Sequence, residues 1–179
     1  MKLRAADYGL RIRLVIVGLL CAASVLRAET IDRVLAVVVG QPITLSDVTA
    51  ARELGLQPIA TGSSADPVRI VLNALIDREL ILAEVERYAP AEPSTDAIDR
   101  QIAQVRSRFA TADTFAAALA HGGLSEKDLR ARLREDLRIA AYLDQRFAAA
   151  QTRRQALLDD WLAGLRNRGD IVDLYLTRN

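Results

Sequence analysis

The stretch that decides the fold is DPVRIVLNALIDRELILAEVERY, residues 66–88. Asp66 is a typical N-cap residue, and Pro67 suits the first helical position, where a missing N–H costs nothing. Apolar residues then recur at helical spacing in two neighbouring rows, which predicts a central helix with neighbours on at least two sides. At 1.5 Å per residue this helix is about 33 Å long. Its charged residues, among them Arg78 and Glu79, predict a narrow hydrated side.

The first 28 residues have the three-part pattern of a secretory signal peptide. Basic residues precede the uncharged apolar run from Leu14 to Leu26, and Ala28 provides a small residue for cleavage. The run is shorter than the about 20 residues of a comfortable membrane span, and an uncleaved anchor is the alternative. A lipoprotein signal is excluded, because Leu20 precedes Cys21 where a small residue is needed. We therefore expect an exported protein of residues 29–179 that forms a single module.

Removal of this leader changes the charge and the cysteine content. The leader holds five of the 24 Lys and Arg residues and one of the 23 Asp and Glu residues, so the remainder has a net charge of −3. Nucleic-acid binding then lacks its usual electrostatic signature. Cys21 is the only cysteine, so the exported chain has neither a disulfide nor a thiolate ligand.

Short strands are predicted at both ends of the exported chain. Val34 to Val39 is a continuous valine-rich run, typical of a strand buried on both faces. A turn at Gly40-Gln41-Pro42 and a short extended piece from Ile43 follow. Asp170 to Thr177 alternates in polarity, which would half-bury one face of a strand, formed by Val172, Leu174 and Leu176. Because an isolated strand is unstable, we expect the two ends to pair.

Between these ends the sequence predicts helices with short connections. Capping-box patterns begin at Thr44 and Ser125, each with an aspartate three residues later. The predicted helices are 44–54, 66–88, 95–109, 111–120, 125–147 and 153–168. The fold class is therefore mainly α, with a small β-sheet formed by the N- and C-terminal strands. Residues 29–147 hold the first strands and core helices, and residues 151–179 hold the closing helix and strand.

No familiar catalytic pattern is present, and we predict no enzyme, no metal site and no cofactor. His121, the only histidine, is interpreted as a solvated residue at a helix end, so metal sites and serine-type triads lack ligands or a base. Lys127, the only lysine after the leader, has no glycine-rich phosphate loop beside it. Carboxylate pairs such as Glu135-Asp136 are interpreted as solvated. The 51% of hydrophobic residues instead suggests a core plus a groove for apolar segments of another chain.

Three segments resemble the chaperone module of bacterial periplasmic proteins of the SurA and PpiD type. IDRVLAVVVGQPITLSDV, residues 31–48, is similar to the opening strand, turn and first helix, with Val39 where asparagine is usual. VLNALIDRELILAEVERY, residues 71–88, resembles the central helix, with Ala83 where glutamine is common. FAAALAHGGLSEKDLRARLREDLRIAAYLDQRF, residues 115–147, resembles the helix pair that ends the module. Larger members carry parvulin-type prolyl isomerase domains after this pair, for which the chain has no room.

The resemblance implies an ATP-independent periplasmic chaperone, a holdase, that binds apolar segments of unfolded envelope or outer-membrane proteins. An interaction or structural subunit that binds one folded partner is the alternative, and a peptidyl-prolyl isomerase is a remote one. The expected partners are unfolded or partly folded polypeptides, with no nucleic acid and no stable membrane insertion once the leader is removed. The candidate peptide-binding residues are Ile70, Ile81, Phe115, Leu119, Tyr142, Phe147 and Trp161.

Overall fold

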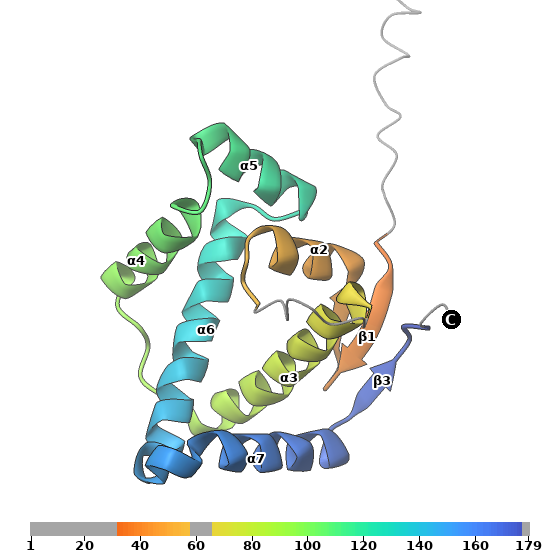
Figure 1. Ribbon diagram of the computed structural model, residues 1–179, viewed down its shortest axis with the longest axis vertical. Coiled ribbons are helices and arrows are strands. Elements are labelled where there is room, and N and C mark those ends of the chain that lie inside the picture. Colours follow the sequence, from red (N-terminus) through yellow and green to blue (C-terminus); the bar gives the residue numbers. More distant parts are fainter. Residues whose placement is uncertain (1–31, 58–65, 177–179) are drawn as a thin grey trace, which may run out of the picture. The chain divides into compact units, whose positions relative to one another are not determined.

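The computed structural model describes residues 32–57 and 66–176, and Figure 1 shows how their elements are arranged. The predicted signal peptide lies outside the described residues. The elements are β1 (Val34–Val38), β2 (Gln41–Thr44), α2 (Leu45–Glu53), α3 (Pro67–Tyr88), α4 (Thr95–Arg106), α5 (Ala112–His121), α6 (Glu126–Arg146), the 3₁₀ helix η1 (Ala148–Arg153), α7 (Arg154–Arg168) and β3 (Ile171–Asp173). The fold is mainly helical with one small antiparallel sheet, as predicted.

The helix starts follow local capping rules. Thr44 and Ser125 each accept a hydrogen bond from the backbone N–H of the aspartate three residues later, and that aspartate accepts one in return. Both predicted capping boxes are thus confirmed. Asp66 caps α3 by accepting from the backbone N–H of Val68, with Pro67 at the first helical position.

The sheet joins the two ends of the described chain. Its strand order is β2-β1-β3, and both pairs are antiparallel. Val38 lies opposite Ile171, and Ala36 lies opposite Asp173. The predicted pairing of the N-terminal and C-terminal strands is therefore confirmed, and β1 is the central strand.

The prediction of which side chains of β3 face the core is wrong by one position along the strand. Ile171 and Tyr175 pack against the core, whereas the exposed large side chains of this segment are Val172, Leu174 and Leu176. The register explains this, because Ile171 is paired with Val38, whose side chain is fully buried. A shift of one residue moves every side chain of a strand to the other face, and apolar alternation alone does not show which face is inward.

The β1–β2 turn also differs from its prediction. Val39 and Gly40 form a two-residue turn with φ values of 50° and 79°, the left-handed conformation at both positions that a type I′ hairpin requires. Gln41 and Pro42 belong to β2, where proline is tolerated because β2 lies at the sheet edge. Val39 is exposed in this turn and is not part of a strand buried on both faces.

Val39→Asn should stabilise the protein. A β-branched residue at positive φ is strained by about 1 kcal/mol or more, and asparagine adopts this conformation with less strain. We expect the free energy of unfolding to rise by about 1 kcal/mol, measured by urea titration. Val39→Thr is the control, because threonine is polar but remains β-branched. Equal stability of the two variants would contradict this explanation.

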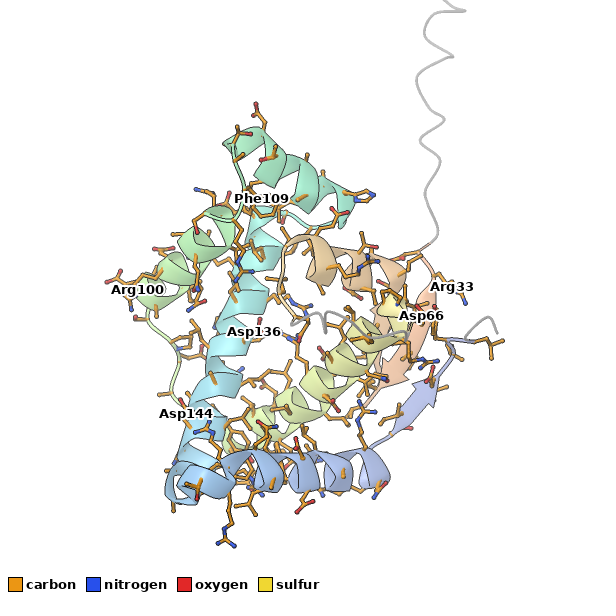
Figure 2. All side chains as sticks on the ribbon, in the orientation of Figure 1. Arg33, Asp66, Arg100, Phe109, Asp136 and Asp144 are labelled. Carbon is orange, nitrogen blue, oxygen red and sulfur yellow. The ribbon has the colours of Figure 1, made fainter. Side chains whose placement is uncertain are left out.

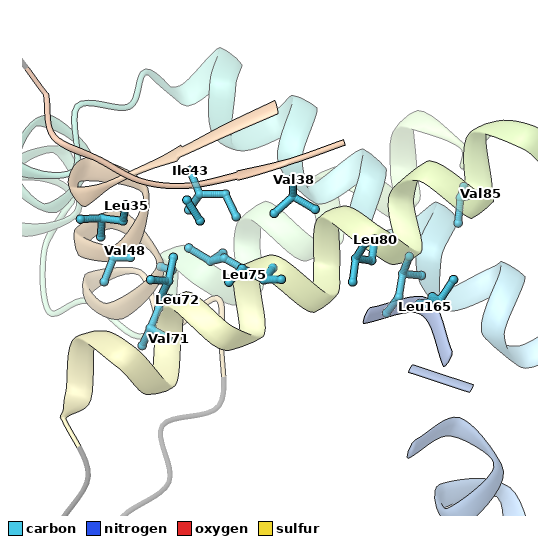
Figure 3. Close-up of a cluster of buried hydrophobic side chains, with 14 of the residues drawn as sticks. Leu35, Val38, Ile43, Val48, Val71, Leu72, Leu75, Leu80, Val85 and Leu165 are labelled. Carbon is cyan, nitrogen blue, oxygen red and sulfur yellow. The ribbon is translucent and has the colours of Figure 1, made fainter. Parts of the chain in front are cut away.

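The main core lies between the sheet and α3. Figure 3 shows Leu35, Val38 and Ile43 facing Leu72 and Leu75 across this interface. The central position predicted for α3 is correct, since it also contacts α2, α6 and α7. A second cluster joins α4, α5 and α6; its fully buried members include Leu54 and Leu129, which are covered by side chains of those helices.

The hydrated side predicted for α3 is covered by α6 at Arg78, whereas Glu86 and Arg87 near the end of the helix are exposed as predicted. Arg78 is only 6% exposed, and its guanidinium donates to carboxylates of Glu79, Glu135 and Asp136, each at 2.7 Å. Figure 2 labels Asp136, midway along α6. The prediction that Glu135 and Asp136 are merely solvated is therefore wrong, because α6 packs on this side of α3 and both carboxylates bind Arg78.

Candidate peptide-binding site

The described residues offer little conventional site chemistry. Among them, no group of three or more His, Cys, Asp and Glu side chains could hold a metal ion. No helix of residues 32–57 and 66–176 is long and apolar enough to cross a membrane. His121 is exposed in the last turn of α5, and its Nδ1 lies 2.5 Å from Oε1 of Glu53. Large apolar side chains are also exposed, among them Tyr88 and Leu157.

Three of the predicted site residues meet where α6 ends and α7 passes α3. The ring centroids of Tyr142 and Trp161 are 6.1 Å apart, and those of Phe147 and Trp161 are 5.8 Å apart. Tyr88, the last residue of α3, adds its ring 5.4 Å from that of Tyr142. We call these four residues, Tyr88, Tyr142, Phe147 and Trp161, the aromatic corner. Asp144, labelled in Figure 2, marks this end of α6.

The other four predicted site residues lie elsewhere. Phe115 and Leu119 are buried in the second core cluster, and Ile81 is buried in the main core. Ile70 is half-buried near the start of α3. The predicted set therefore does not form one surface, because helical periodicity identifies an apolar face without showing whether another helix already covers it.

Within the corner the four rings have different exposures. Tyr142 and Phe147 are buried, Trp161 is half-buried, and Tyr88 is 63% exposed. Burial raises the pKa of the Tyr142 hydroxyl above its ordinary value. Tyr142 and Phe147 thus form the buried part of the aromatic corner, and Tyr88 forms its accessible part.

The sequence analysis missed three site residues, Tyr88, Leu157 and Arg146, of which Arg146 lies closest to the other rings. Its guanidinium carbon lies 5.0 Å from the ring centroid of Trp161, 5.8 Å from that of Phe147 and 6.0 Å from that of Tyr142. Such contacts are attractive because a cation interacts with the negative face of an aromatic ring. The i, i+4 spacing of Tyr142 and Arg146 on α6 was the available signal.

Two open hollows flank Arg146. The first, the tyrosine hollow, has a volume of about 380 Å³ and is lined by Tyr88, Pro90, Tyr142, Gln145 and Arg146. The second, the alanine hollow, has a volume of about 440 Å³ and is lined by Arg146, Phe147, Ala149, Ala150, Arg153 and Leu157. Both volumes lie in the range of about 300–1,000 Å³ that is usual for ligand sites. Each hollow could accommodate a large apolar side chain.

The local sequence creates this arrangement at two helix ends. Ala89, in the left-handed conformation, ends α3 directly after Tyr88, and Pro90 prevents its continuation. Phe147 is the C-cap of α6, and η1 then turns the chain into α7. The arrangement combines apolar surface with one cation close to the aromatic rings, which suits contact with apolar and aromatic side chains. No protein-family model matches this chain, and no curated protein matches it.

Proposed function

We propose that the protein is an ATP-independent chaperone of the holdase type, which binds apolar segments of unfolded envelope proteins at the aromatic corner. The observation that carries this proposal is the exposure of large apolar side chains beside the two hollows. Tyr88 borders one hollow with 63% of its surface exposed, and Leu157 borders the other with 41% exposed. Exposed apolar surface around a concave site is typical of a binding surface.

The shape of the site favours weak and reversible binding. Both hollows are open, and each is large enough for one or two side chains of a client. A micromolar dissociation constant corresponds to about −8 kcal/mol, which is enough to delay aggregation and still allows exchange without ATP. Several such contacts along one unfolded chain would add to the overall affinity.

The proposal that the protein acts in the periplasm rests on the sequence. The signal-peptide pattern of residues 1–28 supports export, and the likeness of three segments to the SurA and PpiD type supports the periplasm. The clients that we propose in the periplasm are unfolded envelope proteins.

One observation favours the alternative, a subunit that binds a folded partner. Val34 of β1, Val172 of β3 and Leu174, which follows β3, are exposed, and an apolar sheet surface suits packing against a folded partner. The two functions therefore predict different binding surfaces on the same protein.

Suppression of the aggregation of an unfolded outer-membrane protein, assayed without ATP, tests the proposal. We expect the wild type to suppress aggregation and the double variant Tyr88→Ser/Leu157→Ser to lose about tenfold in apparent affinity, equivalent to about 1.4 kcal/mol. Both side chains are exposed, so thermal unfolding should be nearly unchanged.

The matched control is Val172→Ser/Leu174→Ser, which removes apolar surface from the sheet instead. This control should retain full activity. Loss of activity in the control alone would place client binding on the sheet face and contradict the aromatic corner as the site, and a wild type that does not suppress aggregation would refute the holdase proposal.

A further inference from the structure

The alanine hollow carries positive charge that the described residues do not neutralise. Arg146 and Arg153 both line the hollow and are both exposed. Within residues 32–57 and 66–176 neither forms an ion pair, and the hydrogen bond of Arg146 is to the hydroxyl oxygen of Tyr142, at 3.3 Å. The neighbouring Arg154 differs, because its Nη2 lies 2.5 Å from Oδ1 of Asp144.

Arg146 is held in place by its aromatic neighbours. Its guanidinium carbon lies within 6.0 Å of the ring centroids of Tyr142, Phe147 and Trp161, and its Nη1 donates to the hydroxyl oxygen of Tyr142, so several neighbours restrict the side chain. A fixed arginine loses little conformational entropy when it binds a carboxylate, so its interaction is more favourable than that of a freely moving side chain.

The start of α7 adds to this positive potential. The helix begins at Arg154 with no side-chain N-cap and no acidic residue in its first turn. The N-terminal end of a helix has a partial positive charge, which is stabilised by a nearby anion. The alanine hollow, defined by Phe147, Ala149, Ala150 and Leu157 between two arginines, thus combines an apolar floor with a cationic edge.

We propose that this hollow selects polypeptide segments in which a carboxylate stands beside a large apolar side chain. The apolar side chain enters the hollow, and the carboxylate accepts hydrogen bonds from Arg146 and Arg153. This inference rests on the proposed holdase function and names the class of client segment that the corner prefers.

The surrounding charges favour a single carboxylate over an extended polyanion. The carboxylates of Asp144, Asp159 and Asp160 are exposed on α6 and α7, so the two helices that border the hollow also carry negative charge. A nucleic acid or an anionic membrane surface needs a broad basic surface. A carboxylate on a polypeptide needs only the two arginines.

Three labelled peptides test the inference by fluorescence anisotropy at low salt. All share one aromatic core, which is flanked by Glu, Gln or Lys. We expect the Glu peptide to bind about tenfold more tightly than the Lys peptide, with the Gln peptide between them, and we expect salt to reduce the difference. Vesicles rich in anionic phospholipid serve as the competing probe.

Variants locate the effect on the hollow. Arg153→Gln leaves the aromatic stacking intact and should reduce the preference for the Glu peptide about threefold, while binding of the Gln peptide stays unchanged. Arg146→Gln should reduce the preference further and should also weaken binding of the Gln peptide. Arg100→Gln, at an exposed position on α4, is the control and should change nothing.

The outcomes separate the inference from the function on which it rests. Equal affinity for the three peptides would overturn the inference and leave the holdase proposal standing. A Glu preference that persists in Arg153→Gln would overturn the assignment to this hollow. Displacement of the Glu peptide by anionic vesicles would favour a membrane surface instead. If no peptide binds, the holdase proposal fails as well.

Discussion

Arg78→Ala should lower the free energy of unfolding by about 3 kcal/mol, a value typical of breaking a buried ion pair. The side chain connects α3 to α6 through Glu135 and Asp136, and its Nη2 also donates to the backbone carbonyl of Arg132 at 3.4 Å. Its removal takes away the guanidinium to which Glu79, Glu135 and Asp136 are hydrogen-bonded. Urea titration of the variant and the wild type measures the difference.

The charge state of Arg78 does not limit this prediction. Burial by itself lowers the pKa of Arg78, but the carboxylates of Asp136, Glu135 and Glu79 raise it above its ordinary value. The guanidinium is therefore charged at every pH at which the protein is folded. Because Glu135 and Asp136 are about one-third exposed and can be rehydrated, the loss lies at the lower end of the range for buried pairs.

Two further variants on α3 define the origin of the effect. Arg87→Ala removes an arginine that is exposed and, among the described residues, paired only with Glu84, so it should change stability by less than about 0.5 kcal/mol. Arg78→Lys keeps the charge without the planar fork of donors and should give an intermediate loss. If Arg78→Ala is as stable as Arg87→Ala, the ion pairs of Arg78 do not hold α3 and α6 together.

The elements that depend on local chemistry were predicted from the sequence. The boxes at Thr44 and Ser125 require only residues three apart, and the proline at the start of α3 acts on its own turn. The pairing of β1 with β3 was also predicted, because a lone strand needs a partner. The capping boxes and the proline act within short stretches of sequence. The strand pairing could be inferred because a lone strand would be unstable.

Features that depend on packing could not be predicted in this way. Charged residues such as Arg78 indicate a hydrated helix side unless another element covers it, and the sequence does not show that α6 does so. The side of β3 that faces the core depends on its pairing with β1, and the apolar alternation that includes Val172 and Leu174 predicted the wrong side. Both errors concern which element lies against which.

The candidate site was predicted only in part, again because the sequence does not show which helices lie against one another. Tyr142, Phe147 and Trp161 were chosen as large apolar residues on helices, and they meet because α6 and α7 converge there. Phe115 has the same local character, yet it packs in a different cluster. Arg146 was missed because its role depends on three rings from two helices.

Deletion of residues 170–179 should abolish cooperative unfolding or cause precipitation. The deletion removes β3, which pairs with β1, and with it the hydrogen bonds that join Val39 to Asp170 and Leu174 to Leu35, each 2.8 or 2.9 Å long. It also removes Ile171 from the main core. The central strand then becomes an unpaired apolar edge, which promotes aggregation.

Tyr175 adds a second link that the deletion removes. Its hydroxyl donates to Asp66, the N-cap of α3, and its backbone carbonyl accepts from Arg69. The hydrogen bond from Tyr175 lowers the pKa of the Asp66 carboxyl below its ordinary value of 3.8. This link therefore stabilises the fold above that pH and is lost as the pH falls through the lowered pKa. Tyr175→Phe should therefore lower the free energy of unfolding at neutral pH and reduce its further loss on acidification, as urea titrations at neutral and acid pH would measure.

Thermal unfolding followed by circular dichroism, together with light scattering, tests the deletion. The control is Val172→Thr/Leu174→Thr, which keeps the strand and changes only its outward side chains. The control should unfold at nearly the wild-type temperature, since exposed substitutions usually change stability by no more than about 0.5 kcal/mol. The deletion should scatter light well below that temperature, because β1 is then an open edge beside exposed core residues. A deletion variant that melts with the wild type would show that β1, β2 and the helices form a complete module without the C-terminal strand.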